Sequence, residues 1–152
     1  MQLPGHRLLV ASTAVGMVIM LTSNLIFPWP IHPGTAHWND ISMAILFPAL
    51  LLLFWALVTL GWLMFRLDPG DKLVNRGPYR YVRHPFFLGM MVAFAGLALA
   101  LNNWLAVAAT LLILWPVLTL RAMREERELA HRFGQEWQIY RQTTYFLIPY
   151  VW

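Results

Sequence analysis

Residues 86–120 read FFLGMMVAFAGLALALNNWLAVAATLLILWPVLTL and carry no charged side chain. The pair Asn102-Asn103 divides this stretch into apolar runs of 16 and 17 residues, Phe86 to Leu101 and Trp104 to Leu120. Because two helices joined by so short a turn must lie antiparallel, the pattern predicts a tight helical hairpin. At about 1.5 Å per residue, each helix is short for a hydrocarbon core of roughly 30 Å. We therefore expect water to reach one end of the hairpin.

The first helix of this hairpin carries small residues at regular spacing, Gly89, Ala93, Gly96 and Ala100. Spacings of four, three and four residues place them on one face of a helix, where another backbone can approach closely. We interpret this face as a packing surface.

Two more uncharged runs precede the hairpin, Leu8 to Phe27 with 20 residues and Ile41 to Phe65 with 25. Each is long enough to cross a bilayer. The 152 residues are 59% hydrophobic and only 12% charged, far from the composition of soluble domains. The sequence predicts an all-α integral membrane protein, a single membrane domain over residues 1–152 with four transmembrane helices at about 8–27, 41–65, 86–101 and 104–120.

The loop from Pro28 to Asp40 contains His32 and His37, but no carboxylate or thiol cluster stands beside them. We expect no metal site there, because stable sites combine several such ligands. The chain has no cysteine, which excludes disulfides and thiolate nucleophiles.

The cations lie in only three parts of the chain. Arg7 precedes the first run, five cations fall between the second and third runs, and five follow the fourth, which accounts for all 11. The positive-inside rule then predicts that both termini are cytoplasmic. The net charge is +4, and the cations lie in loops between apolar runs, where they can contact anionic lipid headgroups. We therefore expect a membrane partner and no nucleic acid.

On the cation-rich side, residues 77–89 read GPYRYVRHPFFLG. Pro85 suits the first turn of a helix, so His84 lies at the mouth of that helix beside Arg80 and Arg83. Free N–H groups at such a helix start favour anions, which predicts a binding site for a carboxylate or phosphate group of a small ligand.

After the fourth run, residues 121–140 predict an amphipathic cytoplasmic helix. Its apolar arc contains Glu126, while Arg121 and Glu125 share the edge of that arc, one turn apart. A carboxylate on an apolar face is costly unless it is paired, hydrogen-bonded or protonated. Gly134 disfavours a helix interior and predicts an early end of this helix.

Together, the pattern G-x-Y-x-x-x-R-H-P-x-x-x-G at residues 77–89 and E-E-x-x-L-x-x-x-F-G-x-x-W-x-x-Y at residues 125–140 resemble the isoprenylcysteine carboxyl methyltransferase and phospholipid methyltransferase superfamily. The resemblance covers residues 73–149. It implies that S-adenosylmethionine binds at the cytoplasmic face, between the segments 71–89 and 121–140.

The resemblance also assigns roles by position. Arg121 corresponds to a substrate-facing arginine, so the expected catalytic residues are Arg121 and Glu125. The chain departs from the family at Phe87, where tyrosine is usual, and at Trp137, which replaces a frequent tyrosine. The expected cofactor-binding residues are Leu73, Val74, Tyr79, His84, Pro85, Phe86, Phe87, Glu125 and Glu126.

The leading functional hypothesis is methyl transfer from S-adenosylmethionine to a lipid-like or prenylated acceptor, with O-methylation of a carboxylate favoured over N-methylation of an amine. Methyl transfer from a sulfonium needs mainly alignment of two reactants. Two alternatives remain open at this point. One is an NADPH-dependent membrane reductase related to the sterol reductases, and the other is a membrane scaffold without enzymatic activity.

Overall fold

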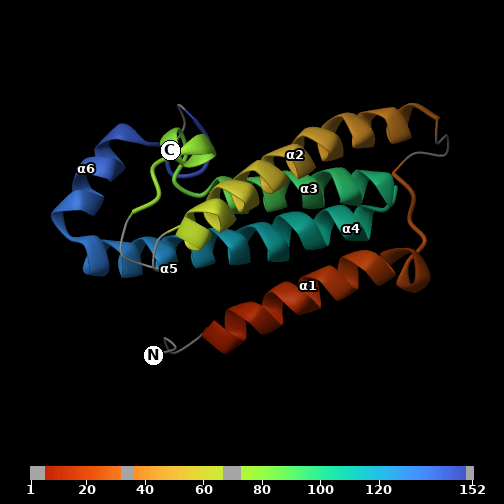
Figure 1. Cartoon of the computed structure of the whole chain (residues 1–152). Coiled ribbons are helices and arrows are strands. Elements are labelled where there is room, and N and C mark those ends of the chain that lie inside the picture. Colours follow the sequence, from red (N-terminus) through yellow and green to blue (C-terminus); the bar gives the residue numbers. More distant parts are fainter. Residues whose placement is uncertain (1–5, 32–35, 67–72, 150–152) are drawn as a thin grey trace. The chain divides into compact units, whose positions relative to one another are not determined.

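The structure, a computed structural model, describes residues 6–31, 36–66 and 73–149. These residues are helical apart from short connections and two isolated bridges, which confirms the predicted all-α class. Figure 1 traces the elements along the chain. They are α1 (His6–Ile26), α2 (Ala36–Arg66), the 3₁₀ turn η1 (Gly77–Arg80), α3 (Pro85–Ala100), α4 (Trp104–Ala109), the π-helical segment η2 (Thr110–Leu114), α5 (Trp115–Phe133) and α6 (Gln135–Thr143).

Within the described residues, three helical stretches are long and apolar enough to cross a membrane, Leu8–Ile26, Trp38–Gly61 and Trp104–Phe133. The helix α3 is also apolar but has only 16 residues. The fourth predicted run, residues 104–120, is the first part of a longer helical stretch, since α4, η2 and α5 follow one another directly. The structure thus shows three long apolar helices and a shorter one.

The chain divides into two compact units. The first consists of Met1–Pro48 and Met91–Arg121, and the second of Ala49–Met90 and Ala122–Trp152. In the first unit, α1 packs against α4 and η2. The core of this unit consists of Met20, Ala98, Ala106, Ala109 and Leu114.

The predicted Asn102-Asn103 turn is present in the first unit. Asn102 adopts a φ of 47°, which asparagine tolerates better than most residues, and the buried Asn103 caps the N-terminus of α4. Its Oδ1 accepts a hydrogen bond from the backbone N–H of Leu105 at 2.8 Å, and its Nδ2 donates to Asn24 Oδ1 on α1 at 2.8 Å. The turn therefore closes the hairpin and ties it to α1.

The small-residue face of α3 packs closely against α2. In the first unit, a Cβ added at Gly96 would lie 3.0 Å from the backbone nitrogen of Leu46. In the second unit, a Cβ at Gly89 would lie 2.8 Å from Leu53 Cγ. The interpretation of this face as a packing surface is confirmed.

Of the two histidines predicted in the loop from Pro28 to Asp40, His37 belongs to the start of α2. His32 lies outside the described residues, and only the backbone of His37 is described.

Replacement of Gly96 tests the close approach of α3 to α2. Alanine is the better helix former by about 1 kcal/mol, but overpacking against a rigid neighbour costs about 1–3 kcal/mol. The closest atom to the new Cβ is backbone, which cannot rotate away. We expect Gly96→Ala to lower the midpoint of thermal unfolding in detergent.

The matched control is Gly61→Ala in α2, where an added Cβ meets no atom within 4 Å. This variant gains the same helix propensity without the clash, so its midpoint should stay unchanged or rise. Equal midpoints for the two variants would contradict the packing role of Gly96.

Candidate functional site

The loop before α3 is shaped by a glycine that no other residue replaces easily. Gly77 has a φ of +57° and begins η1, and a Cβ there would lie 2.6 Å from Thr59 Oγ1. After η1 the chain reaches His84, whose carbonyl oxygen accepts a hydrogen bond from the N–H of Leu88 at 3.0 Å. Pro85 is the first residue of α3, as predicted. His84 therefore stands directly at the helix start.

A second segment, from the far end of the chain, lies beside this loop. Gly134, with a φ of +51°, separates α5 from α6 as its position predicted. After α6, the C-terminal segment (Thr144–Leu147) forms a parallel bridge to the His84 loop (Tyr81–His84). The N–H of Arg83 donates to the Tyr145 carbonyl at 2.8 Å, and the N–H of His84 donates to the Phe146 carbonyl at 3.3 Å.

Sequence reasoning missed this pairing. A bridge of so few residues has no apolar periodicity that could reveal it. The only signal in the sequence is that apolar residues resume at Phe146 and Leu147 after the polar end of α6.

His84 is buried, with 3% of its side chain exposed, between two acidic side chains of α5. Its Nδ1 lies 3.9 Å from Glu125 Oε2 and its Nε2 lies 3.6 Å from Glu126 Oε1. The aromatic rings of Phe146 and Phe87 pack around the imidazole, with centroids at 5.3 Å and 5.8 Å. Among the described residues, no group makes a hydrogen bond to His84 Nε2.

The Glu126 carboxylate has a cation as its partner. Arg83 Nε donates to Glu126 Oε1 at 2.6 Å, and the two side chains are only 8% and 17% exposed. The Nη1 of Arg83 also donates to the carbonyl oxygens of Arg141, at 3.2 Å, and of Thr144. This pairing explains how a carboxylate is tolerated on the apolar face of the helix.

Tyr79 and Tyr140 connect η1 to α6. The hydroxyl of Tyr140 donates to the carbonyl oxygen of Tyr79 at 2.6 Å, and the buried Trp137 ring lies 5.7 Å from the Tyr140 ring. Burial raises the pKa of Tyr79 to about 12, and the nearby Glu125 carboxylate adds to this effect. Burial likewise raises the pKa of Tyr140. Both hydroxyls therefore stay neutral at physiological pH.

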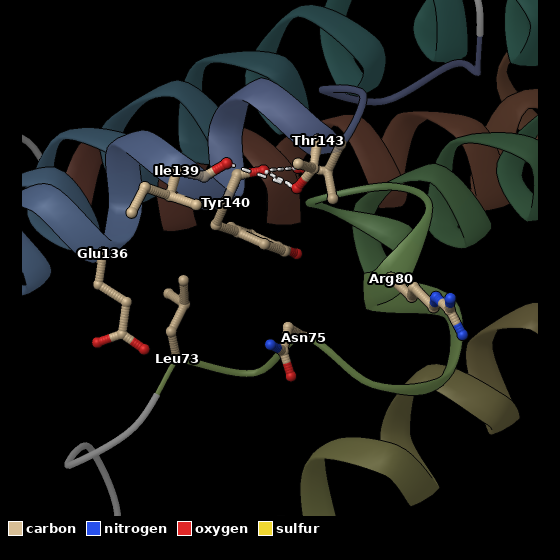
Figure 2. Close-up of a pocket in the computed structure, with 8 residues that line it drawn as sticks. Leu73, Asn75, Arg80, Glu136, Ile139, Tyr140 and Thr143 are labelled. Atoms are coloured by element: carbon tan, nitrogen blue, oxygen red, sulfur yellow. Dashed lines mark hydrogen bonds between the residues drawn. The ribbon is translucent and has the colours of Figure 1, made fainter.

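A cavity of about 370 Å³ opens between the loop and α6 (Figure 2). Leu73 and Asn75 come from the loop, and Ile139 and Tyr140 come from α6. Its volume falls within the range of small-molecule sites, roughly 300–1,000 Å³. The cavity is lined by Leu73, Asn75, Arg80, Glu136, Ile139, Tyr140, Thr143 and Thr144.

Of the residues predicted from the sequence, the structure brings His84, Phe87, Glu125 and Glu126 together, while Leu73 lines the cavity. Arg121 belongs to the first unit, so its relation to these side chains stays a prediction. All of the predicted cofactor-binding residues belong to the second unit, including Val74, Tyr79, Pro85 and Phe86.

The chain is similar to proteins of one known family. A model of the phospholipid methyltransferase family matches residues 40–136. The chain is 28% identical over 147 residues to a "probable protein-S-isoprenylcysteine O-methyltransferase" of Oryza sativa subsp. indica, a match that covers 93% of this chain and 76% of that protein. No solved structure matches the chain.

Two further relatives each match about half of the chain. The protein-S-isoprenylcysteine O-methyltransferase of Schizosaccharomyces pombe is 33% identical over 79 residues, which are 52% of this chain and 34% of that protein. Methanethiol S-methyltransferase 1 of Bradyrhizobium diazoefficiens is 37% identical over 73 residues, 47% of this chain and 24% of that protein.

The family match includes both halves of the site, the His84 loop and the Glu125-Glu126 pair, and covers more than half of the chain. It decides between the hypotheses that the sequence left open, in favour of the methyltransferase over a reductase or a scaffold. This protein belongs to the phospholipid methyltransferase family of multi-pass membrane enzymes, which use S-adenosylmethionine as methyl donor.

Proposed function

We propose that this protein methylates a lipid-like or prenylated acceptor, and that the acceptor atom is a carboxylate oxygen. The observation that carries the proposal is the meeting of the His84 loop with the acidic pair of α5 around one buried imidazole. The relatives in Oryza sativa and Schizosaccharomyces pombe, named as protein-S-isoprenylcysteine O-methyltransferases, support a prenylated carboxylate acceptor.

The residues around His84 fit S-adenosylmethionine. The buried Nε2 has no hydrogen-bond partner among the described residues, so it is available to a polar group of a ligand. The Glu125 side chain is half exposed, so hydroxyl or cationic groups of a ligand can reach its carboxylate. The Phe87 and Phe146 rings offer apolar surface beside them.

We assign the binding of this cofactor to one set of residues in the second unit. The cofactor supplies an activated methyl group on a sulfonium sulfur, whose departure as a thioether needs no proton. The chain's own task is therefore to align donor and acceptor and to exclude water. The proposed set is Leu73, Val74, Tyr79, His84, Pro85, Phe86, Phe87, Glu125 and Glu126.

The proposed catalytic residues are Arg121 and Glu125, one turn apart on α5. A carboxylate acceptor is already ionised at neutral pH, so it needs no general base. The planar guanidinium of Arg121 can hold it through two parallel hydrogen bonds. An amine acceptor would instead have to lose a proton to a carboxylate such as Glu125.

In the bilayer we propose four transmembrane helices within one membrane domain, with α3 as the short third span. The amphipathic region over residues 121–140 then lies at the cytoplasmic face, and both termini are cytoplasmic. The cation distribution supports this orientation. A lipophilic acceptor would reach the site from the bilayer, while the cofactor enters from water.

Binding of S-adenosylhomocysteine to the purified chain in nanodiscs tests the cofactor site. Calorimetry should show binding to the wild type, and a dissociation constant at least about tenfold weaker for His84→Ala and Glu125→Ala, since each loses a polar partner. His131→Ala and Glu128→Ala on α5, both exposed, are matched controls that should bind as the wild type does. A wild-type chain without affinity would refute the proposal.

The acceptor atom can be read from the chemistry of the product. With radiolabelled S-adenosylmethionine, a prenylcysteine with a free carboxylate should take up methyl groups that alkali releases as methanol, because the product is an ester. The same compound with its carboxylate converted to an amide should take up none. Alkali-stable label in phosphatidylethanolamine or in a small thiol would contradict carboxylate methylation.

In the same assay, Arg121→Lys should lower kcat/KM for the carboxylate acceptor by about tenfold or more, because an ammonium cannot form the two parallel bonds. Affinity for S-adenosylhomocysteine should not change. The exposed Arg127→Lys on the same helix is the control. Equal kcat/KM values for the two variants would remove Arg121 from the acceptor site.

A further inference from the structure

Arg83 bonds to three different parts of the second unit. Its Nε donates to Glu126 on α5, and its Nη1 donates to the carbonyl oxygens of Arg141 on α6 and of Thr144 beyond α6. The side chain is only 8% exposed. Since its charge is balanced by Glu126, Arg83 is poorly suited to bind an acceptor carboxylate itself.

The His84 loop and the C-terminal segment share only a few backbone hydrogen bonds. Tyr145 N–H donates to Tyr81 O at 3.1 Å, and the N–H groups of Arg83 and His84 donate to Tyr145 O and Phe146 O. So short a pairing has marginal stability without side-chain support. Arg83 supplies this support, because its side chain bonds to the backbone at the point where α6 ends and the C-terminal segment begins.

Two side chains that line the His84 site, which we call its walls, are also in contact with Arg83. The C-terminal segment carries Phe146, whose ring packs edge-on against His84 and also lies 5.9 Å from the guanidinium carbon of Arg83. The other wall is Glu126, held by Arg83 at 2.6 Å and lying 3.6 Å from His84 Nε2. Both walls are therefore attached to one guanidinium.

We propose that Arg83 is a positioning residue, which sets the shape of the cofactor site by holding the C-terminal segment and Glu126 against His84. This inference rests on the proposed function, because it assumes that the cofactor binds beside His84. The role requires a planar group with several donors in fixed directions. A lysine ammonium carries its three donors on one nitrogen, so it cannot reproduce the separate positions of Nε and Nη1 that reach Glu126 and the two carbonyl oxygens.

Hydrogen exchange and ligand affinity, measured on the full chain in nanodiscs, test this role. We expect Arg83→Lys to raise the exchange rates of the Arg83-position, His84 and Tyr145 amides by about tenfold or more, and to weaken S-adenosylhomocysteine binding about tenfold. The control Arg76→Lys, an exposed arginine in the same loop, should leave both quantities at the wild-type value.

The outcomes separate a positioning role from a purely structural one. Unchanged amide exchange in folded Arg83→Lys would overturn the proposal, and so would faster exchange with unchanged affinity, because Arg83 would then stabilise the fold without shaping the site. If wild-type chain fails to bind S-adenosylhomocysteine, the proposed function is refuted instead. The exchange comparison needs no cofactor, so it would still decide whether Arg83 holds the segment.

A second variant covers the case in which Arg83→Lys does not fold. Glu126→Gln keeps an oxygen that accepts from Arg83 Nε but removes the negative charge, so the bond becomes weaker without being lost. We expect a smaller increase in exchange at the same three amides. Wild-type exchange rates in this variant would overturn the proposal.

Discussion

A buried ion pair between Arg83 and Glu126 joins the His84 loop to α5 in the second unit. Moving two charges out of water is costly, and their attraction compensates only when the geometry is good and the remaining donors are satisfied. Here the distance is 2.6 Å, and further N–H groups of the guanidinium reach backbone carbonyl oxygens. Loss of one partner from such a pair typically costs about 3–5 kcal/mol, since it leaves a buried charge alone.

The same ion pair lies at the N-terminal end of the apolar helix α3. The helix α3 contains no charged residue, yet the loop that enters it carries Arg83 and His84. These side chains meet the acidic residues of α5 and the C-terminal segment. A polar site at a helix start can contact water on one side and apolar side chains on the other. Such a position suits an enzyme family whose cofactor is polar and whose relatives include enzymes named for prenylated substrates.

In methyl transfer from a sulfonium the leaving thioether needs no proton, so catalysis depends mainly on the alignment of the two reactants. This is why residues that touch no reactant can matter to the reaction. The imidazole of His84 is held by its neighbours on α5, by two phenyl rings and by backbone bonds to the C-terminal segment. The departure from the family pattern at Phe87 fits this view, because its ring still packs against His84 without a hydroxyl.

Local pattern and backbone preference were enough to predict the helical class, the long apolar helices, the Asn102-Asn103 turn, the packing face of α3 and the break at Gly134. The two motifs in the sequence also led to the family. The sequence indicated that Glu126 needs a partner but did not name Arg83. The pairing of Arg83 with Glu126 and the packing of Phe146 against His84 became visible in the folded chain alone. These contacts join residues more than 40 positions apart through single side chains and a few backbone bonds, which leave no periodic trace in the sequence.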